Sequence, residues 1–515
     1  MCTKPIGLRC RPEGARSWPF STSADAPESS RLPRGLSIEN APPPIRLSGC
    51  QKCLNAYPVC DGEDFVSMSV KQRERKGAAE VSLLDLIARF KSEGSAVEVN
   101  FRQLVTTDGS TNKSAHAIHP YPAKLLLNIP KFFIDALPTV SGSVLLDPFC
   151  GSGTVLYEGA LAGLRPIGSD SNPLARLITK AKLTSVDREA AQLQLDEVMA
   201  SYPSALPTIP DVVNRQYWFS ERISDCLGRL KTAIERSVPA RHRPVFDVSF
   251  SATVRRVSYA DPRLSVPVKI NPDRSARYGA KGDEVIRRLG RLADIDVGAT
   301  FWSIASQNIQ RCPERGQGFA VDQPELFSDA RSLGLADSTV GFAITSPPYV
   351  GAQKYVRASS LSLGWLGLTP DCKLRPIERR SIGREHLAAD EMLEPAGTGV
   401  AEADSLLDEI VERNPLRARI AQRYLLEMRE ALSELSRTMA HDGSLVLVVG
   451  PNLVAGLEFP TPLFLQQIAE SLGFSTQLHL IDSIDSRGLM TKRNRTAGVI
   501  QQESVFLLKR VRVGA

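Results

Sequence analysis

A short stretch near residue 346 carries the side chains best suited to chemistry. Ser346, Pro347, Pro348 and Tyr349 directly follow an apolar run in which a buried strand is expected to end. Two consecutive prolines fix φ near ~−65° and remove two backbone donors, so they cannot continue a central strand. The result is a rigid turn whose hydroxyl and carbonyl groups can accept hydrogen bonds and whose ring can stack on a planar ligand. The structural alternative is a proline turn that only closes the strand.

A second candidate site lies where an apolar run meets a glycine-rich turn. SGSVLLDPFCGSGT (141–154) contains the run, Asp147, and the glycines Gly151 and Gly153, and VLYEGALAGL (155–164) predicts the helix that follows. Glycines let the backbone approach a bound molecule closely, and the helix N-terminus offers unpaired N–H groups. This arrangement predicts a binding turn between a strand and a helix.

The next segment completes a strand–helix–strand unit. RPIGSDSN (165–172) predicts a second strand that ends on Asp170, and Pro173 is expected at the first position of the next helix. A carboxylate about 20 residues past the turn can accept both hydroxyls of a ribose. Thr154, Val155 and Leu156 interrupt the G-x-G-x-x-G pattern, which weakens a dinucleotide interpretation. A nucleotide-binding βαβ unit remains the prediction.

These motifs, taken in order, resemble those of S-adenosylmethionine-dependent DNA amino-methyltransferases (N4-cytosine / N6-adenine family, SPPY type). The matching stretches are HPYPAKL (119–125), DPFCGSGT (147–154), GSDSNPLA (168–175) and TSPPY (345–349). Four matches in the family's order are more specific than any single one.

The resemblance implies an α/β class I methyltransferase (Rossmann-like) fold, a doubly wound, mostly parallel sheet with large insertions. DGSLVLVVG (442–450) is expected to form the fifth strand, residues 461–474 its helix, and ESVFLLKRVRV (503–513) an antiparallel closing strand between two others. Periodicity predicts these strands but not their order.

The resemblance also assigns roles to individual residues. The Ser346 hydroxyl and the Pro347 carbonyl would accept the N–H groups of the target amine, Pro348 would keep the turn rigid, and Tyr349 would stack on a base flipped out of the duplex. S-adenosylmethionine is the implied cofactor, and no metal is needed. The residues expected to bind the cofactor are His119, Tyr121, Lys124, Asp147, Phe149, Gly151, Gly153, Thr154, Asp170, Asn172 and Asp329.

The target base is less closely defined. In this family, serine before Pro-Pro-Tyr is usual for cytosine N4 and aspartate or asparagine for adenine N6, so Ser346 favours cytosine. Three alternatives stay open: adenine N6, an RNA or protein amide acceptor, and a non-catalytic module that only binds the cofactor. No Pro-Cys dipeptide occurs, which disfavours methylation of a ring carbon through a cysteine nucleophile.

Positive charge is concentrated in one part of the chain. Residues 241–291 contain 12 Lys and Arg against 5 Asp and Glu, whereas the whole chain carries a net charge of +6. They belong to an insertion, 186–323, that a cofactor-binding core does not require. We expect a target-recognition region for double-stranded DNA, with a solvated basic face as the alternative. The expected DNA contacts are Arg255, Arg256, Arg274, Arg277 and Lys281.

The remaining segments divide the 515 residues further. Residues 1–76 are rich in Pro, Ser and Arg and predict a flexible extension, 77–515 form the methyltransferase domain, and 369–414 predict a mobile loop. Cys50, Cys53 and Cys60 have zinc-like spacing but lack a nearby fourth ligand.

Composition indicates the kind of cellular compartment in which the chain works. No apolar run approaches the ~20 residues of a membrane span, and the nine scattered cysteines favour a reducing compartment. We therefore expect a soluble, cytoplasmic protein with no membrane partner and with a restriction or defence protein as a possible partner. The oligomeric state does not follow from the sequence.

Overall fold

The computed structural model describes residues 81–106, 114–122, 124–273, 279, 282–315, 324–351, 354–369, 373–388, 397–483 and 502–511. The chain divides into two units, Met1–Gly77 and Ala78–Ala515, and all described elements belong to the second. The expected extension 1–76, with Cys50, Cys53 and Cys60, lies outside the described residues. The same holds for Arg274, Arg277 and Lys281.

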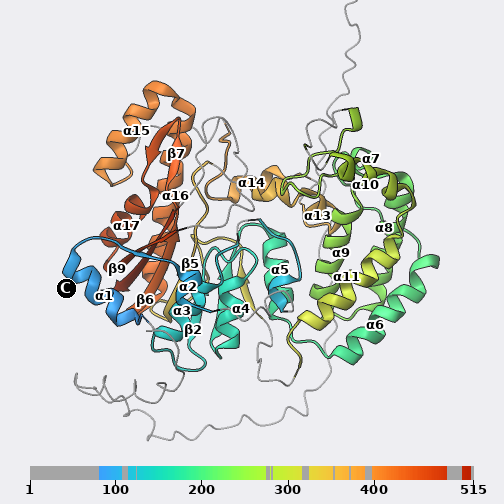
Figure 1. Ribbon diagram of the computed structural model, residues 1–515, viewed down its shortest axis with the longest axis horizontal. Coiled ribbons are helices and arrows are strands. Elements are labelled where there is room, and N and C mark those ends of the chain that lie inside the picture. Colours follow the sequence, from blue (N-terminus) through green and yellow to red (C-terminus); the bar gives the residue numbers. More distant parts are fainter. Residues whose placement is uncertain are drawn as a thin grey trace, which may run out of the picture. The chain divides into compact units, whose positions relative to one another are not determined.

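An eight-stranded sheet forms the centre of the second unit (Figure 1). Its order is β1-β9-β10-β6-β5-β2-β3-β4, and every neighbouring pair is parallel except the two that involve β10. The strands are β1 Val97–Val99, β2 Val144–Asp147, β3 Arg165–Ser169, β4 Glu325–Phe327, β5 Val340–Thr345, β6 Met439–Val449, β9 Phe474–Ser483 and β10 Gln502–Arg510. The expected mostly parallel sheet, with an antiparallel last strand between two others, is confirmed. The short edge strand β1 was not foreseen.

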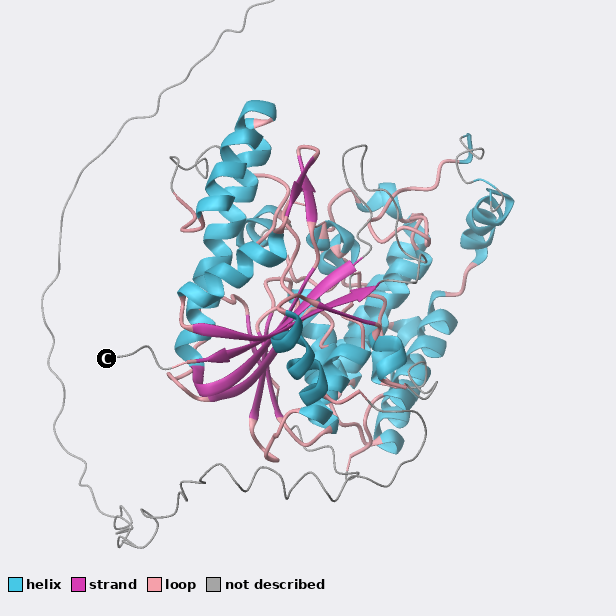
Figure 2. Cartoon of the chain, turned by 60° about the vertical axis from the view of Figure 1, so that its left-hand side comes forward, coloured by secondary structure: helices cyan, strands magenta, loops and turns pink. Residues whose placement is uncertain are grey.

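Alternating side chains bury both faces of this sheet. Leu145 and Val446 pack into one apolar layer, whereas their neighbours Leu146 and Leu447 pack into the other. This alternation follows from the period of two along a strand. Figure 2 shows helices on both sides of the twisted sheet. The first layer contains α1 Leu83–Glu93, α2 Phe101–Leu104 and α3 Asn128–Ala136, and the second contains α15 Ala401–Arg413, α16 Pro415–Thr438 and α17 Thr461–Ser471.

Two helices follow the strands that carry the predicted binding residues. The first, α4 (Thr154–Leu161), begins after Gly153, and α5 (Pro173–Leu183) begins after Asn172. The Asn172 side chain caps α5 by accepting a hydrogen bond from the backbone N–H of Leu174 at 3.1 Å. Pro173 occupies the first helical position, as predicted.

The first insertion is a helical bundle that leaves and rejoins the sheet domain at one place. A parallel bridge pairs Val186 with Glu314, and the Val186 N–H donates to the Pro313 carbonyl at 2.8 Å. The core of the bundle continues into that of α4 and α5. Its helices are α6 Arg188–Ser201, α7 Arg215–Trp218, α8 Glu221–Ser237, α9 Arg243–Val257, α10 Gly282–Asp294 and α11 Val297–Arg311.

Short elements complete the described chain. They are the 3₁₀ turns Ala115–Ala117 and Tyr202–Ser204, the helices α12 Tyr355–Ala358, α13 Ser360–Trp365 and α14 Arg375–Arg380, and the hairpin β7 Asn452–Val454 with β8 Leu457–Phe459. No helix among the described residues is both long enough and apolar enough to cross a membrane.

Candidate cofactor and catalytic site

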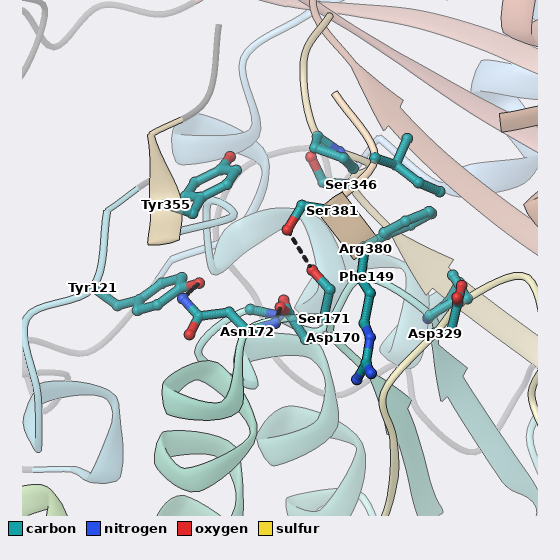
Figure 3. Close-up of a pocket in the computed structure, with 15 residues that line it drawn as sticks. Tyr121, Phe149, Asp170, Ser171, Asn172, Asp329, Ser346, Tyr355, Arg380 and Ser381 are labelled. Carbon is teal, nitrogen blue, oxygen red and sulfur yellow. Dashed lines mark hydrogen bonds between the residues drawn. The ribbon is translucent and has the colours of Figure 1, made fainter. Parts of the chain in front are cut away.

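A pocket opens at the carboxyl edge of the sheet, where strand order reverses between β2 and β5. Ligands of open α/β sheets bind in the crevice at such a switch point. Residues that follow β2, β3, β4 and β5, and residues from segments far apart in sequence, surround this space (Figure 3). The lining residues are Tyr121, Pro148, Phe149, Gly151, Asp170, Ser171, Asn172, Asp329, Ala330, Ser346, Pro348, Tyr355, Arg380, Ser381 and Ile382.

The glycine turn after β2 needs its two glycines for different reasons. Gly151 and Gly153 have φ of 51° and 72°, a region that side chains with a Cβ rarely adopt. A Cβ on Gly153 would also lie 2.7 Å from the Thr179 hydroxyl, so this glycine lets α4 pack against α5. Only Gly151 lines the pocket; Gly153 and the buried Thr154 support the turn from behind.

Asp170, which directly follows β3, lines this pocket with its carboxylate. Its Oδ2 accepts a hydrogen bond from the Gly151 N–H at 3.0 Å, and its Oδ1 accepts one from the Asn172 N–H at 2.8 Å. Burial raises the pKa of Asp170 to about 6, against the effect of these two donors. The glycine turn and the carboxylate therefore form one unit at the pocket wall.

Asp147 has a different position from the one expected. It is buried outside the pocket lining, and its Oδ1 accepts from the Thr345 hydroxyl at 2.7 Å and from the Phe149 N–H at 3.1 Å. Burial raises its pKa to about 7. Thr345 is the last residue of β5, so Asp147 connects the ends of β2 and β5 and holds the crevice between them.

Asp329, after β4, lines the opposite side of the pocket. Arg331 holds it with two hydrogen bonds, of 2.9 Å from Nε to Oδ1 and 2.8 Å from an Nη to Oδ2. Burial acts to raise the pKa of Asp329, but the hydrogen bonds and charge of Arg331 outweigh it and keep the pKa below its usual value. Asp329 therefore stays ionised at the pocket edge.

Only some of the predicted residues in the 119–125 motif line the pocket. Tyr121 lines the pocket, and its hydroxyl accepts from the Asn172 side chain at 3.2 Å. His119 is buried against the Ser251 hydroxyl at 2.9 Å, and burial lowers its pKa to about 3. Lys124 donates to the carbonyls of His116 and His119. Neither His119 nor Lys124 reaches the pocket, so both serve to shape the segment.

The Ser346–Tyr349 turn also contributes only part of its residues to the pocket lining. Ser346 and Pro348 line the pocket, whereas Pro347 and Tyr349 do not. The Tyr349 hydroxyl donates to Oε1 of Glu503, on β10, at 2.8 Å. This bond anchors the ring to the neighbouring part of the sheet.

Several lining residues were not predicted from the sequence. Pro148, Ser171 and Ala330 adjoin predicted positions, and proximity along the chain could have indicated them. Tyr355 comes from α12, where its ring lies parallel to that of Tyr121 with centroids 6.3 Å apart. Arg380, Ser381 and Ile382 come from the segment expected to be a mobile loop, and nothing in their sequence indicated a contact with the site.

Comparisons with known proteins agree with this geometry. The RMKL-like methyltransferase domain family, UPF0020, matches residues 123–198, the segment that carries the glycine turn and Asp170. The Type II methyltransferase M.MvaI of Kocuria varians is 23% identical over 410 residues, which cover 75% of this chain and 88% of that protein. M.BsoBI of Geobacillus stearothermophilus is 20% identical over 55% of this chain and 58% of its own length, and M.MjaII of Methanocaldococcus jannaschii is 30% identical over 22% and 18%.

The chain has a class I methyltransferase fold. The resemblance predicted from the motifs is thereby confirmed, and S-adenosylmethionine is the methyl donor of this enzyme class. The pocket of the methyltransferase fits that cofactor, because Gly151 leaves space for close backbone approach and Asp170 presents a half-buried carboxylate at the wall. Asp329, on the far side, can accept from an adenine amine.

Arg255 and Arg256, both predicted to contact DNA, have different positions in the structure. Arg255, expected to contact DNA, instead donates to the carbonyls of Asp261 and Leu264 and so braces the loop after α9. Arg256 is the exposed member of the pair. Arg288 donates to the Arg256 carbonyl at 2.8 Å, and burial, followed by the charges of Arg256 and Arg291, lowers the pKa of Arg288. Like charges thus gather where α9 ends beside α10.

Proposed function

We propose that this methyltransferase transfers a methyl group from S-adenosylmethionine to the exocyclic amine of a base flipped out of double-stranded DNA, with N4 of cytosine as the favoured target. Ser346 before Pro-Pro-Tyr supports cytosine through the family pattern, and adenine N6 is the second candidate. The observation that carries the proposal is that Ser346 and Asp170 line the same pocket at the switch point of the sheet.

An exocyclic amine is a poor nucleophile because its lone pair is delocalised into the ring. In the proposal, the Ser346 hydroxyl and the Pro347 carbonyl accept its two N–H groups, which draws the nitrogen toward a tetrahedral shape and releases the lone pair. When bound, the cofactor would supply a methyl group on a positively charged sulfur. The amine nitrogen would take this methyl group as the carbon–sulfur bond breaks, and would release one proton to solvent.

The cofactor would be held by residues that follow β3 and β4 and by Tyr121 from the segment before β2. Asp170 would accept the ribose hydroxyls, Asp329 would bind the adenine, and Tyr121 and Asn172 would contact the methionine end. Tyr349, with its hydroxyl on Glu503, would stack on the flipped base. These roles follow from the family's motifs, and the positions of Asp170, Asp329 and Tyr121 at the pocket support them.

Two observations support DNA as the substrate. The relatives along most of the chain are Type II methyltransferases, a class that works in restriction-modification. The cluster of Arg256, Arg288 and Arg291 on the helical insertion offers closely spaced positive charge, for which phosphate groups are a natural partner.

The substrate class can be tested with purified protein and S-adenosylmethionine carrying a labelled methyl group. We expect label in double-stranded DNA of mixed sequence, and labelling of the same DNA that is about 100-fold slower or more with a Ser346→Ala variant that still binds the cofactor. Label in RNA or in protein, but not in DNA, would contradict the proposal and favour the RNA or amide alternative. Cofactor binding without transfer to any of the three would favour the non-catalytic alternative.

A further inference from the structure

Five residues at the end of α14 and directly after it contact the loop after β3, the Ser346–Tyr349 turn and the residues that hold Asp329. This 380–384 segment consists of Arg380, Ser381, Ile382, Gly383 and Arg384, and its first three members line the pocket. The roles assigned by the methyltransferase motifs include none of them. Figure 3 shows Ser381 reaching across the pocket toward Ser171.

The segment contacts the loop expected to hold the cofactor. The hydroxyls of Ser171 and Ser381 are 3.0 Å apart, and Ser381 also donates to the Ile377 carbonyl at 3.0 Å. Because the Ser381 proton is used in that second bond, Ser171 is the donor of the first. Ser171 directly follows Asp170, so this bond joins the segment to the carboxylate at the pocket wall.

The same segment lies directly against the Ser346–Tyr349 turn. Gly383 has φ of 76°, and a Cβ built on it would lie 2.5 Å from the Tyr349 carbonyl oxygen and 3.4 Å from Cβ of Pro348. Real Cβ atoms do not approach a backbone oxygen this closely. The missing side chain therefore allows the segment backbone to pack onto the turn, and any larger residue would push the turn away.

A buried charge network fixes the end of the segment. Arg384 is buried and donates to both carboxylate oxygens of Glu427, at 2.8 Å and 2.9 Å. Glu427 also accepts from Arg423 and lies 3.4 Å from Arg331, the partner of Asp329. The segment is thus tied to α16 and, through Arg331, to the opposite side of the pocket.

We propose that the 380–384 segment positions the catalytic turn relative to the cofactor loop, with Gly383 as the positioning residue and the Ser171–Ser381 bond as the link to cofactor binding. This inference rests on the proposed function, because it gives the Ser346–Tyr349 turn a catalytic role. The segment acts through the turn and does not itself touch the reacting atoms.

The test compares Gly383→Ala with Gly367→Ala. Gly367 has a similar φ of 67°, but a Cβ there meets nothing within 4 Å, so it controls for backbone strain alone. In Gly383→Ala we expect amide hydrogen exchange of the peptide around 341–351 to be about tenfold faster, with or without S-adenosylhomocysteine. We also expect kcat on DNA to fall about 100-fold while the Kd of the cofactor stays within a few-fold. Gly367→Ala should change neither exchange nor kcat.

A second pair of variants tests the Ser171–Ser381 hydrogen bond without introducing a steric clash. Ser381→Ala should fold normally but lose most of the extra protection that S-adenosylhomocysteine gives the turn peptide, and Ser381→Thr, which keeps the hydroxyl, should restore it. Unchanged exchange of the turn in both Gly383→Ala and Ser381→Ala would overturn the inference. The exchange readout needs no DNA, so wild-type protein that methylates no DNA would refute the proposed function without deciding this one.

Discussion

Ser346 lies one residue beyond the strand that Thr345 ends, and Thr345 is hydrogen-bonded to Asp147 on the neighbouring strand. The serine hydroxyl is therefore held by backbone that two strands fix, which is the preorganisation that a hydrogen-bond acceptor for a developing charge requires. Tyr349 differs from Ser346 because a specific bond to Glu503 fixes its ring from outside the pocket. The two side chains should respond differently to substitution.

Substitution of Ser346 and Tyr349 separates chemistry from binding. Ser346→Ala and Tyr349→Ala should each lower kcat by about 100-fold or more, the scale for loss of one transition-state contact, and leave cofactor affinity within a few-fold. Tyr349→Phe keeps the ring and loses only the bond to Glu503, so its kcat should fall far less. Steady-state kinetics with calorimetry measure both quantities. Full activity in Tyr349→Ala would remove its ring from the site.

Cofactor affinity should depend on pH through Asp170. Burial raises the pKa of its carboxyl to about 6, and a ribose diol needs the ionised form as acceptor. Affinity should therefore be full above pH 6 and fall by up to about tenfold for each pH unit below it. Asp170→Asn should bind more weakly and show no such change. If the change persists in Asp170→Asn, another group carries it, and Asp147, with its pKa of about 7, is the first to examine.

Helices α9 and α10 bring together positive charges that lie in two separate segments of the sequence. The backbone of Arg256 accepts a bond from Arg288, and Arg291 lies one turn further along α10. Arg255 is directed into the protein instead, because its guanidinium binds the carbonyls of the loop after α9. Arg255 thus supports the loop after α9, whereas its neighbour Arg256 lies at the surface.

Charge reversal should reveal this difference. Arg256→Glu with Arg291→Glu should weaken DNA binding and flatten its salt dependence, because each lost phosphate contact removes about 0.9 from the slope of log affinity against log salt. Arg255→Ala should instead lower the stability of the protein and leave the slope unchanged. Binding titrations at several salt concentrations, with thermal unfolding alongside, distinguish the two. An unchanged slope in the double variant would place the DNA contact elsewhere.

Distant parts of the chain meet around one buried carboxylate in α16. Glu427 contacts Arg331 near β4, Arg384 after α14 and Arg423 on its own helix, so it joins segments nearly 100 residues apart. Removing one partner of a buried ion pair leaves the other charges without compensation, which is far more costly than losing an exposed pair.

Glu427→Gln should lower the free energy of unfolding by about 3 kcal/mol. Glu409→Gln is the matched control, because Glu409 pairs with Arg413 on an exposed helix face and should contribute no more than about 0.5 kcal/mol. Urea unfolding of both variants gives the comparison. Similar losses in the two would mean that the network does not hold these segments together.

The sequence predicted the parts of the molecule that depend on local pattern. Strand, glycine turn and helix around Gly151, the first helical position of Pro173 and the antiparallel β10 all follow from periodicity, turn chemistry or the family resemblance. Contacts between distant segments could not be predicted from the sequence. Tyr355 and Ser381 enter the pocket only because α12 and the segment after α14 fold back over it, and Arg255 turns inward only because a particular loop offers carbonyls. Neither effect leaves a periodic signal.

Nucleoside mass spectrometry of DNA provides the most direct test of the proposed chemistry. The gene would be expressed in a host that lacks its own DNA methylases, with the Ser346→Ala variant as control, and the host DNA would be digested to nucleosides. We expect N4-methylcytosine in the wild-type sample and much less of it in the control. N6-methyladenine would contradict the assignment of the base but keep the mechanism, whereas DNA without either modified base, from cells that contain the folded protein, would contradict DNA amine methylation itself.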